Sequence, residues 1–480
     1  MPVLIPKPSD IIDRDAEWAS LSTMWARPRP DLAFVVGRRR VGKSYVLARF
    51  ARAVGGIYFQ ATRQTEAEQL AGLSRVVGEH FGDAALRLGV GFPGWDALFD
   101  YVAERAEGGP FLLVLDEFPY LAEAAPALPS ILQRAWDHPW AESRMKVVLS
   151  GSYVTAMARL EEADQPLYGR RTARLTFAPF GVPEAARFVP EWPVRDQFLA
   201  YGLYGHLPGL LALIDPGLTL AENAAEHLLS ASGRLADEAQ HVLDAFLGES
   251  GVHYSILEAI AGGAQTWSEL TSRVGRTGGS LSRPLAWLEG MGLLERAVPV
   301  TEKRPDRSKR ALYRVIDPYL ALWHRVIAPL VHSGSIGLAE PARLWTESVA
   351  PKLDNHMGSV FEAVCRDFVG RGARSEAGRL PFRPLRVGAW WDARGRDEVD
   401  VVALGGRGEL LVGEAKWGPV TEAHLRTLKR RAALVEAEMG NVSSVHLALF
   451  TGRGEADDAV RAFAEAGQVL LFTGEEIREG

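Results

Sequence analysis

The sequence predicts an α/β protein that begins with a parallel-sheet domain, continues through helical segments and ends in a second α/β domain. Its 480 residues suffice for about two to four domains. Residues 1–180 alternate short apolar runs with amphipathic stretches, which is the βαβ pattern of a parallel sheet. From Leu385 onward a strand–turn–strand–helix pattern predicts the second α/β domain.

The composition is that of a globular protein. Hydrophobic residues make up 47% and charged residues 24% of the chain, unlike the apolar-poor composition of disordered chains. No apolar run approaches the roughly 20 residues that a bilayer requires, and the start MPVLIPKPSD lacks the layout of a signal peptide. We therefore expect a cytoplasmic protein with no membrane contact. The single cysteine, Cys365, excludes an internal disulfide.

The charge balance restricts any nucleic-acid contact to local basic patches. The chain has 54 Lys and Arg residues against 60 Asp and Glu residues, a net charge of −6. Only eight of the 54 basic residues are lysine, so a lysine within a motif is informative. Lys43 and Lys416 are two such lysines.

Five apolar runs are the expected strands of the first domain, residues 1–180. They are Leu32–Val36, Gly56–Gln60, Phe111–Asp116, Lys146–Gly151 and Thr172–Phe177. Helical stretches follow the first run and separate the others, as the crossovers of a parallel sheet require.

A phosphate-binding motif follows the first strand. Residues Gly37, Arg38, Arg39, Arg40, Val41, Gly42, Lys43 and Ser44 match the G-x-x-x-x-G-K-[ST] pattern between a strand and a helix. Such a loop supplies converging N–H donors and a positive pole for a triphosphate. Lys43 is expected to reach the β- and γ-phosphates and Ser44 to bind Mg²⁺, so the motif predicts ATP and Mg²⁺ as cofactors. The alternative is an ordinary glycine-rich turn.

Two carboxylates follow the third strand. The apolar run delivers Asp116 and Glu117 to the carboxyl edge of the sheet, where ligands of such sheets bind. Asp116 is expected to bind Mg²⁺ through water, and Glu117 to act as general base on the attacking water. The alternative for Glu117 is a charge at a helix N-terminus.

Two further residues are candidates for the same site. The hydroxyl of Ser152, after the fourth strand, could sense the γ-phosphate, or it is a plain turn serine. Arg170 could neutralise the transition state, within its own chain or from a neighbouring subunit. A solvated basic turn is its alternative.

The motifs of the first domain resemble the archaeal-type AAA-related P-loop ATPases. They are DRDAE at 13–17, GRRRVGKS at 37–44, LVLDEF at 113–118, VLSGS at 148–152 and LYGRR at 167–171, and the likeness covers roughly the first 215 residues. The resemblance implies that the GHLPG segment at 205–209 belongs to a lid and contributes to the wall of the nucleotide site. Tyr204 and Gly205 replace the usual double glycine of the family.

Helical periodicity predicts this lid over residues 181–245. The helical segments are Glu184–Phe188, Val194–Tyr201 and Leu235–Leu247.

Residues 246–330 have the spacing of a winged helix-turn-helix module. Expected helices are Tyr254–Ala261, Thr266–Val274 and Ser280–Met291, with Thr266 as an N-cap. Leu281, Leu285 and Leu288 should pack inward. Ser280, Ser282, Arg283 and Trp287 should lie more outward, and Pro284 is tolerable in the first helical turn.

A basic loop joins the two strands expected next, Leu294–Val300 and Ala311–Val315. It carries Lys303, Arg304, Arg307, Lys309 and Arg310 against two acids. With Arg283, these residues could neutralise DNA phosphates, so we expect DNA as a partner. The alternative is a protein-interaction module. The segments SLSRPLAWLEGMGLLER and YRVIDPYLALWHR resemble the same ATPase family, extending the likeness to about residue 330.

The last domain, residues 331–480, contains a hairpin with a carboxylate–lysine constellation. Val399–Leu404 and Glu409–Trp417 read as two strands joined by a glycine-rich turn, so Asp400, Glu414 and Lys416 can converge. Two carboxylates that bind Mg²⁺ and an ammonium group are the catalytic set for phosphodiester cleavage, and Glu362 could add a ligand. The alternative is an inert surface cluster of ion pairs.

This constellation resembles the restriction-endonuclease-like PD-(D/E)xK domain found at the C-terminus of many of these ATPases. The likeness spans roughly Gly358–Val435, and Val399 stands in place of the proline of the motif.

Together these patterns predict an ATP-binding and ATP-hydrolysing protein that binds DNA through a winged helix and could cleave it with a Mg²⁺-dependent C-terminal domain. One alternative is a nucleotide-dependent regulatory switch, or a DNA-binding regulator, with an inert C-terminal domain. Another is an ATP-driven remodelling factor for protein partners. Assembly into a homo-oligomer is left open.

Overall fold

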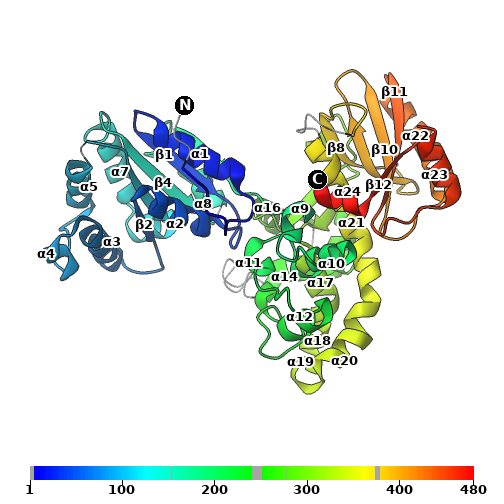
Figure 1. Ribbon diagram of the computed structural model, residues 1–480, viewed down its shortest axis with the longest axis horizontal. Coiled ribbons are helices and arrows are strands. Elements are labelled where there is room, and N and C mark those ends of the chain that lie inside the picture. The colour runs from blue at the N-terminus through cyan, green and yellow to red at the C-terminus, as the bar shows by residue number, and fades with distance from the viewer. Residues whose placement is uncertain (1–4, 107, 153, 241–250, 277, 373–378) are drawn as a thin grey trace. The chain divides into compact units, whose positions relative to one another are not determined.

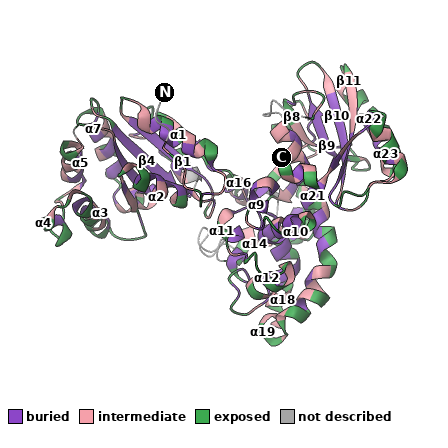
Figure 2. Cartoon of the chain, viewed as in Figure 1, coloured by how far each residue is buried: buried purple, intermediate pink, exposed green. Residues whose placement is uncertain are grey.

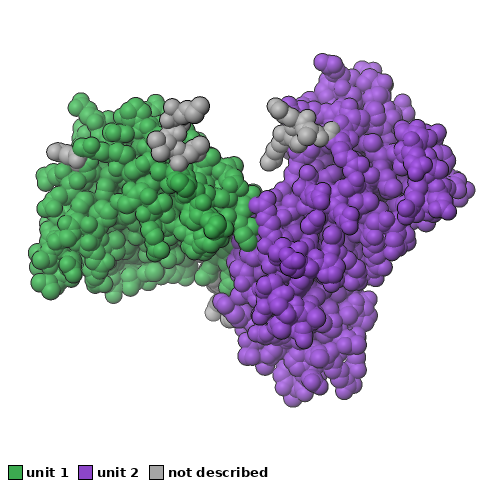
Figure 3. Space-filling model, viewed as in Figure 1, with its two compact units in different colours: residues 1–179 green, residues 180–480 purple. Residues whose placement is uncertain are grey.

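A computed structural model describes residues 5–106, 108–152, 154–240, 251–276, 278–372 and 379–480 (Figure 1). The chain forms two compact units, Met1–Pro179 and Phe180–Gly480 (Figure 3). This division falls next to the predicted boundary at residue 180, and the finer partition of the second unit stays a prediction.

The first unit alternates strands and helices. Its elements are α1 (Asp15–Ala26), β1 (Asp31–Val36), α2 (Lys43–Val54), β2 (Ile57–Gln60), α3 (Glu66–Phe81), α4 (Ala84–Arg87), α5 (Trp95–Arg105), β3 (Phe111–Asp116), α6 (Phe118–Ala124), α7 (Leu128–Asp137), β4 (Met145–Gly151), α8 (Val154–Arg159) and β5 (Ala173–Thr176).

The strands form one parallel sheet in the order β2-β3-β4-β1-β5. All five predicted strands are present, so the predicted parallel sheet is confirmed. In the register, Val36 lies beside Gly151 and Thr176, and Gln60 beside Asp116. The loops after β1, β3 and β4 therefore leave the sheet at the same edge.

Burial explains why these segments form strands. Every residue of β1, β3 and β4 is buried, as Figure 2 shows for β1 and β4. Continuous apolar runs of this kind are typical of parallel strands that helices cover on both faces. The core extends from strand residues such as Phe34 and Leu113 to Trp95 and Trp140.

A buried ion pair joins the opposite, amino edge of this sheet. The Nζ atom of Lys146 lies 2.9 Å from Oδ2 of Asp31, and both side chains are fully buried. The same ammonium donates to the carbonyls of Arg27 and Arg29, and Thr172 donates to Oδ1 of Asp31 at 2.9 Å. This network ties β1 and β4 to the residue that precedes β5.

The second unit opens with helices at the predicted lid. They are α9 (Val182–Ala186), α10 (Val194–Tyr204), α11 (Pro208–Leu211) and α12 (Leu220–His227). Part of the predicted helix Leu235–Leu247, from residue 241 on, lies outside the described residues.

A three-helix module with a two-stranded sheet follows. It comprises α14 (Gly251–Ala261), α15 (Trp267–Val274), the short 3₁₀ segment Gly278–Ser280, α16 (Ser282–Gly290), β6 (Leu294–Ala297), the 3₁₀ turn Pro305–Arg307 and β7 (Leu312–Val315). Thr266 caps α15 in a capping box with Glu269, as predicted.

The burial of α16 agrees with its predicted orientation except at one residue. Leu281, Leu285 and Leu288 are buried, whereas Ser280, Ser282 and Arg283 are exposed. Trp287 is half-buried against His253, so it lies less outward than predicted.

The C-terminal part combines a run of helices with a mixed sheet. The helices are α17 (Pro318–Leu322), α18 (Ala328–His332), α19 (Ser335–Leu338), α20 (Pro341–Leu344) and α21 (Ala350–Gly372), with π-helical segments at Trp323–Ile327 and Trp345–Val349. The later elements are β8 (Arg386–Trp391), β9 (Glu398–Leu404), β10 (Glu409–Lys416), α22 (Glu422–Met439), β11 (Ser444–Thr451), α23 (Asp458–Glu465), β12 (Leu470–Thr473) and α24 (Gly474–Glu479).

The sheet order is β12-β11-β10-β9-β8. The strands β10, β11 and β12 run parallel, whereas β8, β9 and β10 pair antiparallel. The predicted hairpin, formed by β9 and β10, is therefore confirmed. Across the described ranges, no helix combines the length and apolar character needed to cross a bilayer.

The helices of the predicted lid pack on α21 within the second unit. Phe198 of α10 contacts the rings of Phe361 and Trp417, at centroid distances of 5.9 and 5.8 Å. Nε2 of His356 lies 3.0 Å from the carbonyl oxygen of Gly202. These contacts join the lid segment to the C-terminal part.

Candidate functional site

The phosphate-loop motif lies between β1 and α2, as predicted. Gly42 has φ 94°, a left-handed conformation that favours glycine. A Cβ added to Gly37 would meet the carbonyl oxygen of Phe177 at 2.6 Å, so glycine is required there as well. Arg14 supports the loop from behind, because its Nη2 donates to the carbonyls of Val41 and Ala178 at 2.9 and 2.8 Å.

Lys43 begins α2 and is buried in this loop. Its ammonium donates to the carbonyls of Gly37 at 2.7 Å and Arg38 at 3.2 Å, and to Oγ of Ser152 at 3.1 Å. Burial lowers the pKa of Lys43, and the charges of Glu117 and Asp116 oppose that effect. The ammonium thus lies against the phosphate-binding loop, as its predicted contact with the β- and γ-phosphates requires.

Three donors hold the carboxylate of Asp116 at the end of β3. Oδ1 accepts hydrogen bonds from the hydroxyl of Ser150 and from the backbone N–H of Glu117, the latter at 3.0 Å. Oδ2 accepts from the hydroxyl of Tyr58 at 2.7 Å. Burial, followed by the charge of Asp116, raises the pKa of Tyr58, so the phenol stays protonated and donates across the neutral range.

Glu117 and Ser152 form the next part of the site. Glu117 precedes α6 with left-handed φ 52° and ψ 43°, an uncommon conformation for a residue with a side chain. Its carboxylate accepts a hydrogen bond from the Ser152 hydroxyl, and another from the Ser152 backbone N–H at 3.2 Å. The structure therefore brings Lys43, Glu117 and Ser152 together.

These residues fit a nucleotide with Mg²⁺. The first N–H groups of α2 have no partners within the helix and favour anions at that end. The Ser44 hydroxyl and the Asp116 carboxylate are oxygen groups of the kind that Mg²⁺ prefers. The positive charge of Lys43 interacts with the Asp116 carboxylate.

Arg170 lies away from this site. It precedes β5, whereas the phosphate loop follows β1, and the two strands are parallel. Its Nη2 lies 2.7 Å from Oδ2 of Asp137, the last residue of α7. Because strands rise about 3.3 Å per residue, Arg170 is a strand length from the loop of its own chain, which contradicts a role there. The prediction that Arg170 acts at the nucleotide site of its own chain is therefore wrong.

The carboxylate–lysine constellation assembles in the second unit as predicted. Oδ2 of Asp400 accepts a hydrogen bond from the backbone N–H of Ala415 at 2.8 Å, which brings Asp400 beside Glu414 across the hairpin. Nζ of Lys416 lies 2.7 Å from Oε1 of Glu414. Asp400 and Glu414 are buried.

Burial dominates the electrostatics of this cluster. It raises the pKa of Asp400 to about 7, with further contributions from the charges of Glu362 and Glu414. It also raises the pKa of Glu362 on α21. Burial acts to lower the pKa of Lys416, but the hydrogen bond to Glu414 and the surrounding carboxylates outweigh it and raise that pKa.

An arginine that the sequence did not single out occupies the other oxygen of Glu414. Nη1 of Arg431, on α22, lies 3.0 Å from Oε2. In the part of the chain that the structure describes, no group of three or more His, Cys, Asp or Glu side chains is arranged to hold a metal ion. The predicted ligand set thus consists here of Asp400 and an ion-paired Glu414, with Glu362 near enough to act on Asp400.

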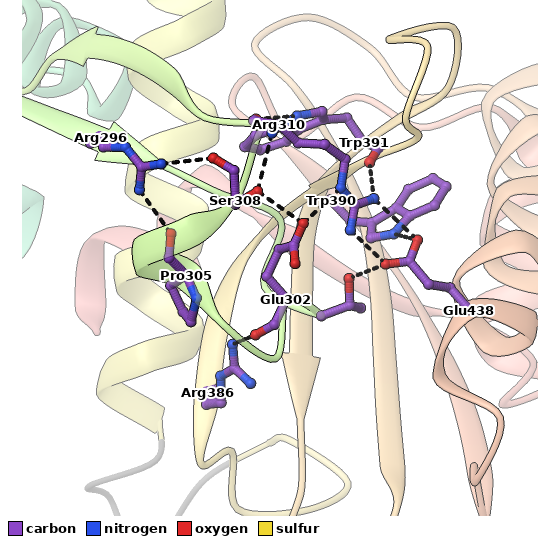
Figure 4. A network of polar contacts seen from close by, with 10 residues as sticks. Arg296, Glu302, Pro305, Ser308, Arg310, Arg386, Trp390, Trp391 and Glu438 are labelled. Carbon is purple, nitrogen blue, oxygen red and sulfur yellow. Dashed lines mark hydrogen bonds and ion pairs between the residues drawn. The ribbon is translucent and has the colours of Figure 1, made fainter.

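Arg310 of the predicted basic loop is fixed to the C-terminal sheet (Figure 4). Its Nε lies 2.9 Å from Oε1 of Glu302, and its Nη2 lies 2.8 Å from Oε1 of Glu438 on α22. Nη1 of Arg310 also donates to the carbonyl of Trp391 at 3.0 Å, and Nε1 of Trp391 donates to the carbonyl of Arg310 at 2.9 Å. These contacts argue against Arg310 as a DNA contact and correct that prediction.

The other predicted DNA contacts remain exposed. They are Arg283, Lys303, Arg304, Arg307 and Lys309. The loop that bears four of them is held by the C-terminal sheet, because the N–H of Val300 donates to the carbonyl of Ala389 at 2.9 Å. The loop is thus a fixed basic surface.

The GHLPG segment packs within the second unit. Gly205 has φ 75°, and an added Cβ would meet Oδ1 of Asp317 at 2.4 Å. Nε2 of His206 lies 3.4 Å from Oδ2 of the same aspartate. The segment is therefore held by the residue that caps α17.

Sequence reasoning missed Tyr58 and Arg431 as functional candidates, and it missed the contact of Ser150 with Asp116. Ser150 and Tyr58 reach Asp116 only because β2, β3 and β4 are neighbours, and strand order is not written in local patterns. Arg431 reaches Glu414 from a helix that follows β10. The one available signal of a functional role was a hydroxyl side chain within an otherwise apolar strand, and both Tyr58 and Ser150 show it.

Comparison with known families supports the prediction of an ATPase domain in the first part of the chain. Residues 11–211 match a family described as an ATPase domain predominantly from Archaea. The chain carries an archaeal-type P-loop ATPase domain. Residues 323–428 match a second family, DUF234, described as archaeal and bacterial proteins of unknown function. The match to the ATPase family thus extends past the first unit to α11.

Individual relatives are distant. An uncharacterised protein of Methanocaldococcus jannaschii is 25% identical over 425 residues, which are 87% of this chain and 90% of that protein. The Walker-type ATPase of Pyrococcus abyssi is 22% identical with a TM-score of 0.53, covering 67% of this chain and 97% of its own. It shares the fold. The ORC2 protein of Aeropyrum pernix is 14% identical with a TM-score of 0.42, over 69% and 97% of the two chains.

Proposed function

We propose that this protein binds and hydrolyses ATP with Mg²⁺ at the carboxyl edge of the first sheet. The observation that carries the proposal is the convergence of Lys43, Ser152 and Glu117 in hydrogen-bond contact beside the loop that opens α2. Lys43 and the loop N–H groups bind phosphates, and Ser44 with Asp116 would hold Mg²⁺. Bound Mg²⁺ supplies charge neutralisation on the phosphates.

Glu117 has the role of general base in this proposal. Its carboxylate accepts two hydrogen bonds from Ser152, which would hold it in place to activate the attacking water. ATP hydrolysis then depends on the Glu117 carboxylate, whereas ATP binding does not. A Glu117→Gln change therefore separates hydrolysis from binding.

The test is to measure ATP binding by calorimetry and hydrolysis by phosphate release, with Mg²⁺. Glu117→Gln should keep ATP affinity and lose about 10²–10⁴-fold in hydrolysis rate. Glu123→Gln, an exposed carboxylate on α6, is the matched control and should match wild type. Wild-type protein without any hydrolysis, or Glu117→Gln with an unchanged rate, would contradict the proposal.

We further propose that the second unit binds DNA through α16 and the basic loop. The helix and hairpin order agrees with a winged helix, and Lys303, Arg304, Arg307 and Lys309 are exposed on a loop that the C-terminal sheet holds. Phosphate contacts of this kind give affinity that falls with salt, with a slope of about −0.9 per contact.

Neutralising these four residues to glutamine should weaken DNA binding and flatten its salt dependence. The matched control neutralises four exposed arginines on helices of the first unit, namely Arg52, Arg75, Arg87 and Arg105. Equal loss in both quadruple variants would mean that the effect is one of total charge and not of the loop. If the wild-type protein does not bind DNA and neither quadruple variant changes ATP hydrolysis, a role in remodelling protein partners is favoured.

Cleavage by the C-terminal domain is the finer part of the proposal. Asp400, Glu414 and Lys416 lie together in a buried hairpin, which supports a restriction-endonuclease-like site with Mg²⁺. A plasmid-nicking assay with Mg²⁺ should show loss of activity in Asp400→Ala and Lys416→Ala. Equal nicking by wild type and both variants would eliminate the nuclease.

One observation favours the alternative, a regulator with an inert C-terminal domain. Both oxygens of Glu414 are in ion pairs, with Lys416 and Arg431. The alternative predicts no nicking by wild type but retained DNA binding.

A homo-oligomer is part of the proposed ATPase function, since Arg170 could serve only the nucleotide site of a neighbouring copy. Sedimentation with and without ATP tests this.

A further inference from the structure

Tyr58 contacts Asp116, one of the two residues proposed to hold Mg²⁺. It is on β2, half-buried, next to β3 in the sheet. Its hydroxyl donates to Oδ2 of Asp116 at 2.7 Å. Asp116 ends β3, so this phenol ties the edge strand β2 to the acidic residue of the nucleotide site.

We propose that Tyr58 is a positioning residue for the Mg²⁺ of the nucleotide site: its hydroxyl orients the Asp116 carboxylate. The inference rests on the proposed function, and it adds a role for a residue outside both motifs.

The direction of this hydrogen bond explains the proposed role. A phenol has one proton, and here it goes to Asp116, since a carboxylate only accepts. The bond engages one lone pair of Oδ2 and fixes the orientation of the carboxylate, whose other lone pairs stay available to a cation.

The other contacts of Asp116 show what Tyr58 alone controls. Ser150 and the N–H of Glu117 both donate to Oδ1, whereas Tyr58 donates to Oδ2. Loss of the phenol hydroxyl would leave Oδ1 fixed and release Oδ2. The expected defect is therefore in cation binding, while the phosphate-binding loop and Lys43 stay intact.

The experiment measures nucleotide affinity of the full-length protein by calorimetry with ATP, once in EDTA and once in Mg²⁺. The Tyr58→Phe variant keeps the ring and removes only the hydroxyl. We expect its ATP affinity in EDTA to stay within about twofold of wild type and the gain on adding Mg²⁺ to fall about tenfold, as loss of a hydrogen bond to a charged group predicts.

The matched control is Tyr101→Phe. The hydroxyl of Tyr101 donates to Oδ2 of Asp83 at 2.9 Å, so this variant also loses one tyrosine–aspartate hydrogen bond of the first unit. It should keep the wild-type gain. Far-UV circular dichroism and a thermal melt compare the folding of both variants with wild type.

A second set of variants tests the link itself. If Tyr58 acts through Asp116, then Tyr58→Phe should cost less of the Mg²⁺ gain in an Asp116→Asn background than in wild type. Additive losses overturn the proposed link. This comparison stands even where Tyr58→Phe lowers stability, because both backgrounds carry the same tyrosine change.

The remaining outcomes each decide a point. A Tyr58→Phe protein with the full Mg²⁺ gain, or with equal losses in EDTA and Mg²⁺, overturns the positioning role but leaves the nucleotide site intact. Wild-type protein that binds no ATP in either buffer overturns the proposed function, and this inference with it.

Discussion

The ammonium of Lys43 lies 3.1 Å from the hydroxyl oxygen of Ser152, although 109 residues separate them in the chain. The same hydroxyl donates to the carboxylate of Glu117. Ser152 thus connects the lysine expected to bind phosphate with the proposed general base. Parallel pairing of β1 with β4 and of β4 with β3 brings the three loops to one edge.

This contact predicts that Ser152→Ala affects hydrolysis more than binding. Without the hydroxyl, Glu117 loses a hydrogen bond that orients it, whereas the phosphate loop is unchanged. We expect the rate of ATP hydrolysis to fall about tenfold, the order of one hydrogen bond to a charged group, with ATP affinity nearly constant. Ser130→Ala, an exposed serine on α7, is the control. A rate equal to wild type would disprove the orienting role.

The buried pair of Lys146 and Asp31 should carry much of the stability of the first unit. In Lys146→Met the carboxylate of Asp31 loses its fully buried partner, and breaking such pairs costs about 3–5 kcal/mol. Arg49→Met breaks an exposed pair with Asp10 and should cost no more than about 1 kcal/mol. Urea unfolding followed by circular dichroism compares them. Equal midpoints for the two variants would refute the importance of burial here.

Arg310 and Glu438 should be energetically coupled. Their ion pair at 2.8 Å spans 128 residues and fastens the basic loop to α22. A double-mutant cycle of Arg310→Gln and Glu438→Gln is expected to give about 1 kcal/mol of coupling, because both side chains are partly exposed. Thermal unfolding provides the measurement. A salt slope of DNA binding that changes as much in Arg310→Gln as in Lys309→Gln would speak against a purely structural Arg310.

Asp400 should make stability depend on pH in a defined direction. Burial raises its pKa to about 7 in the folded chain, above the 3.8 of an unperturbed aspartate. The folded state then holds more protons than the unfolded state between pH 4 and 7, so stability declines as the pH rises through this window and stays reduced above it.

The Asp400→Asn variant cannot ionise and should therefore gain stability over wild type as the pH rises. We expect a difference on the order of 1–3 kcal/mol at pH 8 that vanishes near pH 4, measured by thermal melts in EDTA. Asp164→Asn, at an exposed position, should show no such trend. A constant difference between Asp400→Asn and wild type from pH 4 to pH 8 would rule out the raised pKa.

Local patterns predicted the strands and the phosphate loop because each is a continuous stretch. The apolar run Phe111–Asp116 and the motif at 37–44 carry their own signals, and the structure confirms both as elements. The hairpin that pairs Asp400 with Glu414 was predictable for the same reason, since its two strands are adjacent in sequence.

Long-range contacts were not predictable. The position of Arg170 depends on the direction and order of β5 in the sheet, and the binding of Arg310 to Glu438 depends on how a loop meets a distant helix. Tyr58 reaches Asp116 because β2 is an edge strand beside β3. Such contacts arise from tertiary packing between segments far apart in the chain.

Titration calorimetry of ATP with Mg²⁺ into wild-type protein and Lys43→Ala tests the central claim most directly. A buried ammonium hydrogen-bonded to the loop carbonyls should be essential for phosphate binding. We predict micromolar binding by wild type and at least about 100-fold weaker binding by the variant, as loss of a charged contact of about 3 kcal/mol implies. Absence of heat in wild type, or equal affinity in both proteins, would contradict the account.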